Sequence, residues 1–164
     1  MSLVEFKNLS KNYGTKQALV DVNIEFEKGK IYGLLGPNGS GKTTMIKIIN
    51  DLLQPSGGEI LVNGKEPGIE SKKIISYLPE RTYLNMNMKV SELIQFFKDF
   101  YDDFDEEKAT KLLEKLKINK TDRLKNMSKG TKEKVQLIMV MSRKAELYIL
   151  DEPIGGVDPA SRDY

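Results

Sequence analysis

The chain has 164 residues, of which 39% are hydrophobic and 30% charged, a balance that predicts one globular domain with a packed core. The 26 basic and 24 acidic residues leave a net charge of only +2, which gives no indication of nucleic acid or an anionic membrane as a partner. The chain contains no cysteine and no histidine, which excludes disulfides, zinc–thiolate sites, thiol catalysis and any histidine-dependent site.

The N-terminus shows no signal peptide, and no stretch reaches the roughly 18 apolar residues that a spanning helix requires. We therefore expect a soluble, cytoplasmic chain that reaches a membrane only through another subunit. Strict alternation of apolar and polar residues near the N-terminus predicts half-buried antiparallel strands. A continuous apolar run at 31–35 is typical of a strand buried on both faces. The elements predicted in this part are strands at 4–6, 20–26, 31–35, 59–62 and 74–78, and a helix at 42–53.

The remainder of the chain predicts three helices, at 91–101, 105–117 and 132–143, and a last buried strand at 147–150. The second helix carries one apolar stripe, made by Ala109, Leu112, Leu113 and Leu116, and Asp105 can cap its start. This order of elements predicts an α/β core with an N-terminal antiparallel β subdomain and an inserted helical subdomain over about 85–142. We expect all of residues 1–164 to form one domain.

A glycine-rich loop between the strand at 31–35 and the next helix matches the phosphate-loop pattern G-x-x-x-x-G-K-[ST] in full. Its residues are Gly36, Pro37, Asn38, Gly39, Ser40, Gly41, Lys42 and Thr43. Glycines allow the backbone to curl around phosphate oxygens, and the helix N-terminus adds positive potential. In this pattern Lys42 reaches the β- and γ-phosphates and Thr43 binds Mg²⁺, so the sequence predicts a P-loop NTPase core.

The strand at 147–150 ends in Asp151 and Glu152. If this strand runs parallel to the strand before the phosphate loop, both carboxylates lie beside the nucleotide. Asp151 can then hold Mg²⁺, and Glu152 can accept a proton from the attacking water as general base. Taken alone, the pair is more simply a solvated strand end, and the phosphate loop upstream favours the catalytic interpretation.

Met127-Ser128-Lys129-Gly130-Thr131 precedes a predicted buried helix and resembles the ABC signature Leu-Ser-Gly-Gly-Gln. With it, the whole chain resembles the nucleotide-binding domain of ABC transporters, in family order. The resemblance implies that Tyr13 stacks on adenine, that Thr44 joins the phosphate loop in binding nucleotide, and that Tyr77-Leu78-Pro79-Glu80 is the Q-loop region. Without the resemblance, Tyr13 before Gly14 is also readily interpreted as an ordinary β-turn aromatic. Gly155-Gly156-Val157-Asp158 resembles the D-loop, with Asp158 at the nucleotide.

The resemblance implies an ATPase that binds Mg-ATP and dimerises head to tail, with Ser128 and Gly130 meeting the γ-phosphate held by the other subunit. Ser128 is equally well placed as a plain helix cap. Lys129 and Thr131 replace a glycine and the glutamine of the signature; Lys129 either helps to bind phosphate and tunes pairing or points at solvent. Glu80 stands where most relatives carry glutamine, and we expect it to contact the metal or the water.

The expected partners are a second ABC ATPase domain and integral membrane transport subunits, at the cytoplasmic face of the membrane and without nucleic acid. The Tyr-Leu-Pro-Glu segment favours export. The apolar stretch at 83–88 either packs within the helical subdomain or receives a helix of the membrane subunit.

The resembled family carries a switch histidine beyond the D-loop, and this chain has none. We therefore expect a C-terminally truncated piece that binds ATP and hydrolyses it poorly. Two alternatives stay open: a soluble ABC ATPase that acts on ribosomes or DNA, and a nucleotide-binding regulatory module without turnover.

Overall fold

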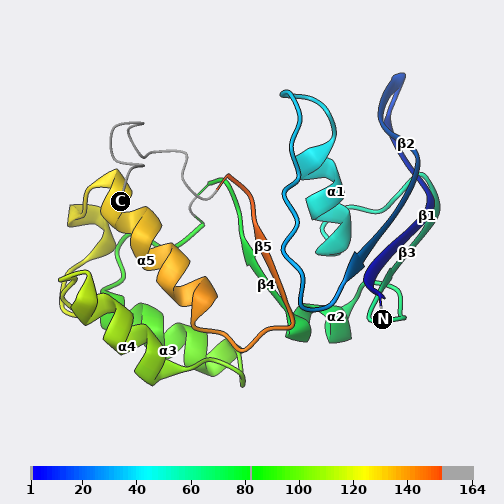
Figure 1. The fold of residues 1–164 in the computed structure, drawn as a ribbon. Coiled ribbons are helices and arrows are strands. Elements are labelled where there is room, and N and C mark those ends of the chain that lie inside the picture. The colour runs from blue at the N-terminus through cyan, green and yellow to red at the C-terminus, as the bar shows by residue number, and fades with distance from the viewer. Residues whose placement is uncertain (1, 82, 153–164) are drawn as a thin grey trace. The chain divides into compact units, whose positions relative to one another are not determined.

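The computed structural model describes residues 2–81 and 83–152. The chain divides into two compact units, Met1–Ile75 and Ser76–Tyr164. The predicted helical insertion at 85–142 falls inside the second unit. In chain order the elements are β1 Ser2–Tyr13, β2 Lys16–Glu27, α1 Lys42–Ile49, β3 Gly57–Val62, α2 Ile69–Ile74, β4 Ile75–Leu78, α3 Val90–Phe100, α4 Glu106–Lys115, the 3₁₀ turn η1 Leu124–Asn126, α5 Lys129–Met141 and β5 Leu147–Leu150 (Figure 1).

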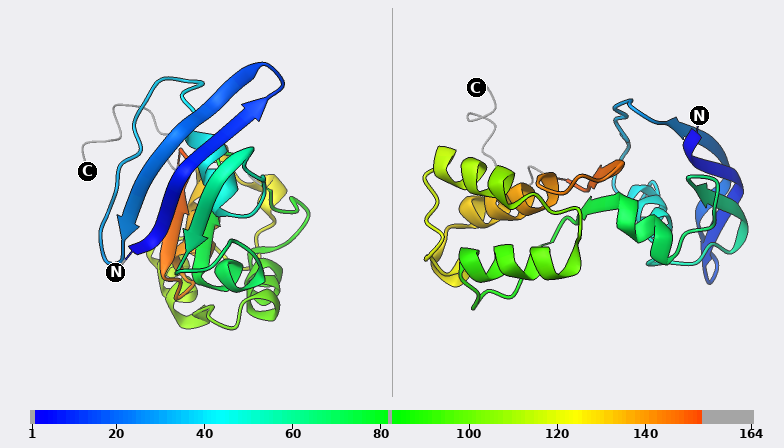
Figure 2. Two further views of the ribbon diagram at one scale, coloured as in Figure 1. Left: turned by 90° about the vertical axis from the view of Figure 1, so that its right-hand side faces the viewer. Right: turned by 90° about the horizontal axis from the view of Figure 1, so that it is seen from below.

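The first unit is built on a three-stranded sheet in which β1 lies between β2 and β3 and runs antiparallel to both (Figure 2). Val4 pairs with Phe26 on one side and with Val62 on the other. The alternating side chains of Val4 and Phe6, together with Leu9, are fully buried. The prediction of antiparallel strands from the alternating pattern is confirmed, and burial of this face of β1 holds the sheet in register. The expected half-burial is wrong for β2, where Val20 is 60% and Ile24 38% exposed.

Helix α1 begins at Lys42, as predicted, but ends at Ile49, four residues before the predicted end. Its buried side chains are Met45, Ile46, Ile48 and Ile49. Asp51 follows with φ 55°, a left-handed conformation that turns the chain out of the helix. Leu52, which lies inside the predicted helix at 42–53, therefore falls outside α1 and is 60% exposed, so the predicted helix is too long at this end.

The run at 31–35 forms no strand, and neither of the sheets found in the described residues includes it. Ile31 and Leu35 are almost wholly exposed, so the prediction of a strand buried on both faces is wrong. A strand needs neighbouring backbone to accept and donate its hydrogen bonds, and no described segment pairs with this one. Tyr32 connects this run to the end of β2: its hydroxyl accepts the N–H of Glu27 at 2.9 Å, and its ring packs edge-on against Phe26.

The described part of the second unit contains three α-helices around one apolar core, and a separate two-stranded sheet of β4 and β5. Asp105 caps α4 by accepting the N–H of Lys108 at 2.9 Å, as predicted. Ala109 and Leu113 are fully buried on the predicted stripe, whereas Leu116 lies at the helix end and is 44% exposed. Of the apolar stretch after β4, Leu84 is buried and Met86 packs against the core, which favours packing within the unit.

Candidate functional site

The phosphate loop curls back over the start of α1, and Lys42 holds the curl in place. The ammonium Nζ of Lys42 donates to the carbonyl oxygen of Gly36 at 2.7 Å and to that of Pro37 at 2.9 Å. Ser40 N–H donates to the same Pro37 carbonyl at 3.2 Å. Both ends of the loop are therefore joined through one positively charged group, which suits an anion bound inside the curl.

Two glycines are required by the shape of this loop. Gly41 precedes α1 with φ 93°, where L side chains are strained, and a Cβ there would lie 2.5 Å from the carbonyl oxygen of Ala18. Gly39 also has a left-handed φ of 84°, although the space beside it is open. Glycine at 41 thus lets the loop lie directly against β2, whereas glycine at 39 only supplies the turn.

The N-terminus of α1 is open to a ligand. Within the described residues no side chain caps this helix end, and its first turn contains no acidic residue. Free N–H groups and the helix dipole attract an anion at such an end. Thr43 is exposed there and Thr44 is half-buried, so the Thr43 hydroxyl is accessible as an oxygen ligand. The exposed residues Asn38 and Ser40 complete the loop.

Tyr13 lies at the end of β1 beside a tight turn, and 47% of it is exposed. The ammonium of Lys11 lies 5.5 Å from the centre of its ring. An exposed aromatic face can stack on a base, as the resemblance implies for this tyrosine. Sequence reasoning did not single out Lys11, although its position two residues earlier on the same strand places it on the same face as Tyr13.

The acidic candidates of the second unit, Glu80, Asp151 and Glu152, follow two adjacent strands, β4 and β5, which run in the same direction (Figure 1). The N–H of Asp151, just after β5, donates to the carbonyl of Leu78 at the end of β4, at 2.9 Å. Burial raises the pKa of Tyr77, and the carboxylates of Asp151 and Glu80 raise it further. The fold thus brings Glu80 and Asp151 together at the carboxyl end of the strands.

The two carboxylates after β5 have different environments. Asp151 is 6% exposed, whereas Glu152 is exposed and has a positive φ of 50°. Positive φ is uncommon for a residue with a side chain, and such residues often stand at functional sites. A buried Asp followed by an exposed Glu fits one residue that holds a ligand in place and one that meets a water molecule.

The predicted metal ligands come from both units: Thr43 from the first, and Asp151 and Glu80 from the second. Among residues 2–81 and 83–152 no three acidic side chains gather into a metal-binding cluster. A hydroxyl and carboxylates are nevertheless the oxygen ligands that Mg²⁺ prefers. The predicted D-loop residue Asp158 lies outside the described residues.

The signature segment forms the start of α5. Ser128 is the N-cap: its Oγ accepts the N–H of Thr131 at 3.1 Å and lies 2.9 Å from the Thr131 hydroxyl. Gly130 has open space beside it in the first turn. Lys129 is exposed and pairs loosely with Glu133, with 3.8 Å between Nζ and Oε1. Ser128 is therefore a helix cap, and its hydroxyl also shares a hydrogen bond with the Thr131 hydroxyl in which either oxygen can be the donor. The sequence did not predict the two hydrogen-bond contacts between Ser128 and Thr131.

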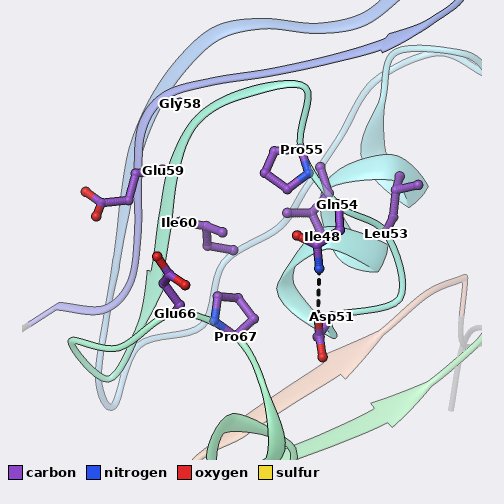
Figure 3. A pocket seen from close by; sticks show the side chains of 10 residues that line it. All are labelled: Ile48, Asp51, Leu53, Gln54, Pro55, Gly58, Glu59, Ile60, Glu66 and Pro67. Atoms are coloured by element: carbon purple, nitrogen blue, oxygen red, sulfur yellow. Dashed lines mark hydrogen bonds between the residues drawn. The ribbon is translucent and has the colours of Figure 1, made fainter.

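A pocket of about 220 Å³ opens elsewhere in the first unit, between the end of α1, β3 and the segment that follows (Figure 3). Ile48 and Ile60 form part of its apolar wall, and Gln54 donates to Asp51 at its edge, at 3.1 Å. None of the residues predicted to bind nucleotide lines this pocket.

The model of the family described as "ABC transporter" matches residues 19–155. The ABC transporter ATP-binding protein YtrB of Bacillus subtilis (strain 168) is 34% identical over 98% of this chain and 56% of its own length. The SkfA peptide export ATP-binding protein SkfE of the same organism is 34% identical, over the whole chain and 71% of SkfE. The chain thus spans little more than half the length of YtrB.

A solved structure described as the ATP-binding subunit of an ABC transporter superposes with a TM-score of 0.86 and 31% identity, over 96% of this chain and 69% of that one. A second, described as a putative ATP-binding protein of an ABC transporter from Pyrococcus furiosus, gives a TM-score of 0.82 at 32% identity, over 96% of this chain and 79% of that one. The predicted fold class, a P-loop NTPase with an antiparallel β sheet, is confirmed by these neighbours. The chain belongs to the ABC transporter family, as an ATP-binding protein.

Proposed function

We propose that the chain binds Mg-ATP at Gly36–Thr44 and belongs to the motor subunit of a transporter, which hydrolyses ATP to drive export through separate membrane subunits. The observation that carries this proposal is the complete phosphate loop, closed on Lys42 ahead of an uncapped helix. In a member of this family, that arrangement is suited to a nucleotide phosphate.

Each candidate residue has a distinct role in the proposed reaction. Lys42 binds the β- and γ-phosphates, while Thr43 and Asp151, with Glu80, hold Mg²⁺. The metal ion would neutralise the charge that develops on the phosphate oxygens. Glu152 orients the attacking water and accepts its proton. Tyr13 stacks on the adenine ring and fixes the other end of the nucleotide.

The proposed active form is a head-to-tail pair of ATP-binding domains. The hydroxyl of Ser128 and the N–H of Gly130 would meet the γ-phosphate bound to the opposite domain, and Asp158 would lie at the same interface. Lys129 adds positive charge there, because its pairing with Glu133 is loose and exposed. Replacement of Lys129 with glycine is therefore expected to weaken dimer-dependent hydrolysis, and unchanged activity would show that this lysine only points at solvent.

Export is the direction that the relatives favour, since SkfE is described as a peptide export protein. No helix among the described residues is long and apolar enough to cross a membrane. We propose that membrane subunits on other chains provide the pathway and hold this domain at the cytoplasmic face.

The experiment compares ATP turnover and gel filtration, at saturating Mg-ATP, for the protein and its Glu152→Gln variant. Turnover by the parent, together with an ATP-bound dimer that fails to turn over in the variant, is the expected result. Equal turnover by both would remove Glu152 from the role of base. If neither form hydrolyses or dimerises, either the altered signature requires an unlike partner or a membrane subunit, or the domain is a nucleotide-binding regulatory module.

A further inference from the structure

The small net charge of the chain conceals a strong separation of charge within the second unit. Residues 115–125 carry five cations and one acid, whereas residues 99–107 carry six acids and no cation. The five cations are Lys115, Lys117, Lys120, Arg123 and Lys125, which we call the basic end. Composition alone could not reveal this separation, because the two segments cancel in the total.

The two segments lie at opposite ends of α5. Asp103 in the acidic segment pairs with Arg143 just beyond the C-terminal end of α5, with 2.9 Å between Oδ1 and Nε, and the N–H of Asp105 donates to the Ser142 carbonyl at 2.7 Å. The basic end leads through η1 directly into the N-terminus of α5 (yellow in Figure 1). Since α5 has 13 residues, its ends are about 20 Å apart. That separation exceeds the screening length of about 8 Å at physiological salt. The charge of Lys120 nevertheless acts on the acidic segment, since it contributes weakly to lowering the pKa of Glu106, after the hydrogen bond and charge of Lys98.

Backbone hydrogen bonds hold much of the basic end as one surface. The Ser91 N–H donates to the Lys120 carbonyl at 2.9 Å, and the Leu124 N–H donates to the Met88 carbonyl at 3.0 Å. The guanidinium of Arg123 donates to the Asn87 carbonyl at 2.6 Å. These bonds fix the backbone of the segment that follows α4 against the start of α3, so that its cationic side chains project from a defined backbone.

The cations of the basic end are not used for internal pairing. Within the described part of the chain, none of the five forms an ion pair, whereas Lys98 pairs with Glu106 at 2.6 Å and Lys144 with Asp105 at 3.4 Å in the same unit. Lys117 also occupies a left-handed conformation, φ 55°, at the end of α4, where glycine or asparagine is favoured. Lys117 therefore occupies a position where local backbone geometry disfavours a side chain.

We propose that the basic end binds the anionic headgroups of a lipid bilayer. Four of its five cations are lysines, which act as point charges, and its residues include no aromatic side chain on which a nucleic-acid base could stack. Leu116, 44% exposed between two of the lysines, adds an apolar side chain that can enter the headgroup region. Clusters of four to eight basic residues bind anionic membranes, with about 1 kcal/mol, or roughly fivefold in affinity, for each residue near the surface.

This inference does not depend on the proposed ATPase function, and vesicle sedimentation tests it without nucleotide. The probes are phosphatidylcholine vesicles with and without 30% phosphatidylglycerol, at about 0.05 and 0.5 M salt. The chain is expected to sediment with the anionic vesicles at low salt only, and not with neutral vesicles. The variant Lys115→Gln, Lys117→Gln, Lys120→Gln, Lys125→Gln is expected to bind at least about tenfold more weakly.

The matched control removes four exposed lysines outside the basic end: Lys28→Gln, Lys47→Gln, Lys108→Gln and Lys111→Gln. Both variants lose four positive charges, so retained binding by the control assigns the effect to the basic end rather than to net charge. Circular dichroism and thermal melting verify that each variant folds. No binding to anionic vesicles at low salt, or equal losses in both variants, would overturn the proposal. Binding to a duplex oligonucleotide but not to vesicles would also overturn it and assign the surface to nucleic acid.

Discussion

The backbone N–H of Asp151 donates to the carbonyl of Leu78 at 2.9 Å, which joins the end of β5 to the end of β4. This bond fixes the residues that follow each strand at the same edge of the sheet. Glu80 and Asp151 come from positions more than 70 residues apart, and their carboxylates both act on the Tyr77 hydroxyl. One edge of a two-stranded sheet thus collects the acidic groups of the proposed metal site.

Alanine substitutions at Gly39 and Gly41 distinguish two reasons for requiring glycine: a positive φ alone, and a positive φ together with close contact to β2. Gly39→Ala introduces backbone strain of roughly 1–2 kcal/mol in open space. Gly41→Ala causes similar backbone strain and also a clash with the Ala18 carbonyl. This carbonyl belongs to the sheet and cannot move freely. Thermal denaturation should show a larger loss of stability for Gly41→Ala, together with loss of Mg-ATP binding. A smaller loss than at Gly39 would contradict the described packing of the loop against β2.

Truncations of two leucines test which apolar residues form the core of the first unit. Leu9 is fully buried, so Leu9→Ala is expected to lower the free energy of unfolding by about 2–5 kcal/mol. Leu35 is 92% exposed, so Leu35→Ala should change it by no more than about 0.5 kcal/mol. Urea denaturation of both variants measures these values. A large decrease in the free energy of unfolding for Leu35→Ala would mean that the run at 31–35 is packed in solution.

Variants of Ser128 separate its role as a helix cap from its proposed role toward phosphate. Ser128→Ala removes the cap and should cost about 1 kcal/mol of stability. Ser128→Asp keeps an effective cap and so should preserve stability, but its negative charge repels the γ-phosphate. Gel filtration with Mg-ATP should therefore show loss of the dimer for Ser128→Asp. Normal dimerisation of this variant would leave Ser128 as a cap only.

The cap of α4 should make stability depend on pH in the acidic range. The Lys108 N–H holds the pKa of Asp105 below its usual value, with a smaller contribution from the charge of Lys144. A carboxylate whose pKa is lowered in the folded state contributes stability above its unfolded pKa, and loses it as the pH falls through the folded pKa. Asp105→Asn keeps a capping oxygen without the charge. The wild type should thus melt higher than this variant at pH 7, and the difference should vanish in strong acid; a difference independent of pH would exclude the charge effect.

The sequence predicted the local elements well where a periodic pattern coincided with a stop signal. Asp105 before the stripe of Ala109 and Leu113 located the start of α4. Alternation around Val4 and Phe6 located β1 but predicted only 4–6 of a strand that runs over Ser2–Tyr13. Leu52 was misassigned because helical spacing continues past Ile49, while the left-handed Asp51 ends the helix. The run at 31–35 was misassigned because apolar composition does not show whether a pairing strand is available.

The phosphate loop was recognisable from its full motif, and the structure adds how Lys42 closes it. The proximity of Glu80 and Asp151 depends on the pairing of β4 with β5, a long-range contact that no local pattern encodes. The sequence pattern thus identifies the acidic groups, whereas their proximity depends on how the strands pair. The basic end, by contrast, is a contiguous run at 115–125 that the sequence does show, and it was missed because the net charge of +2 averages over the whole chain.

The most direct test of nucleotide binding at the phosphate loop is calorimetric titration of Mg-ATP into the chain and its Lys42→Ala variant. Lys47→Ala, an exposed substitution on the same helix, is the matched control. Loss of the charge-assisted contacts should weaken binding roughly 10- to 100-fold in Lys42→Ala and leave Lys47→Ala unchanged. Equal affinities for the wild type and Lys42→Ala, with both folded, would contradict a nucleotide site built around Lys42.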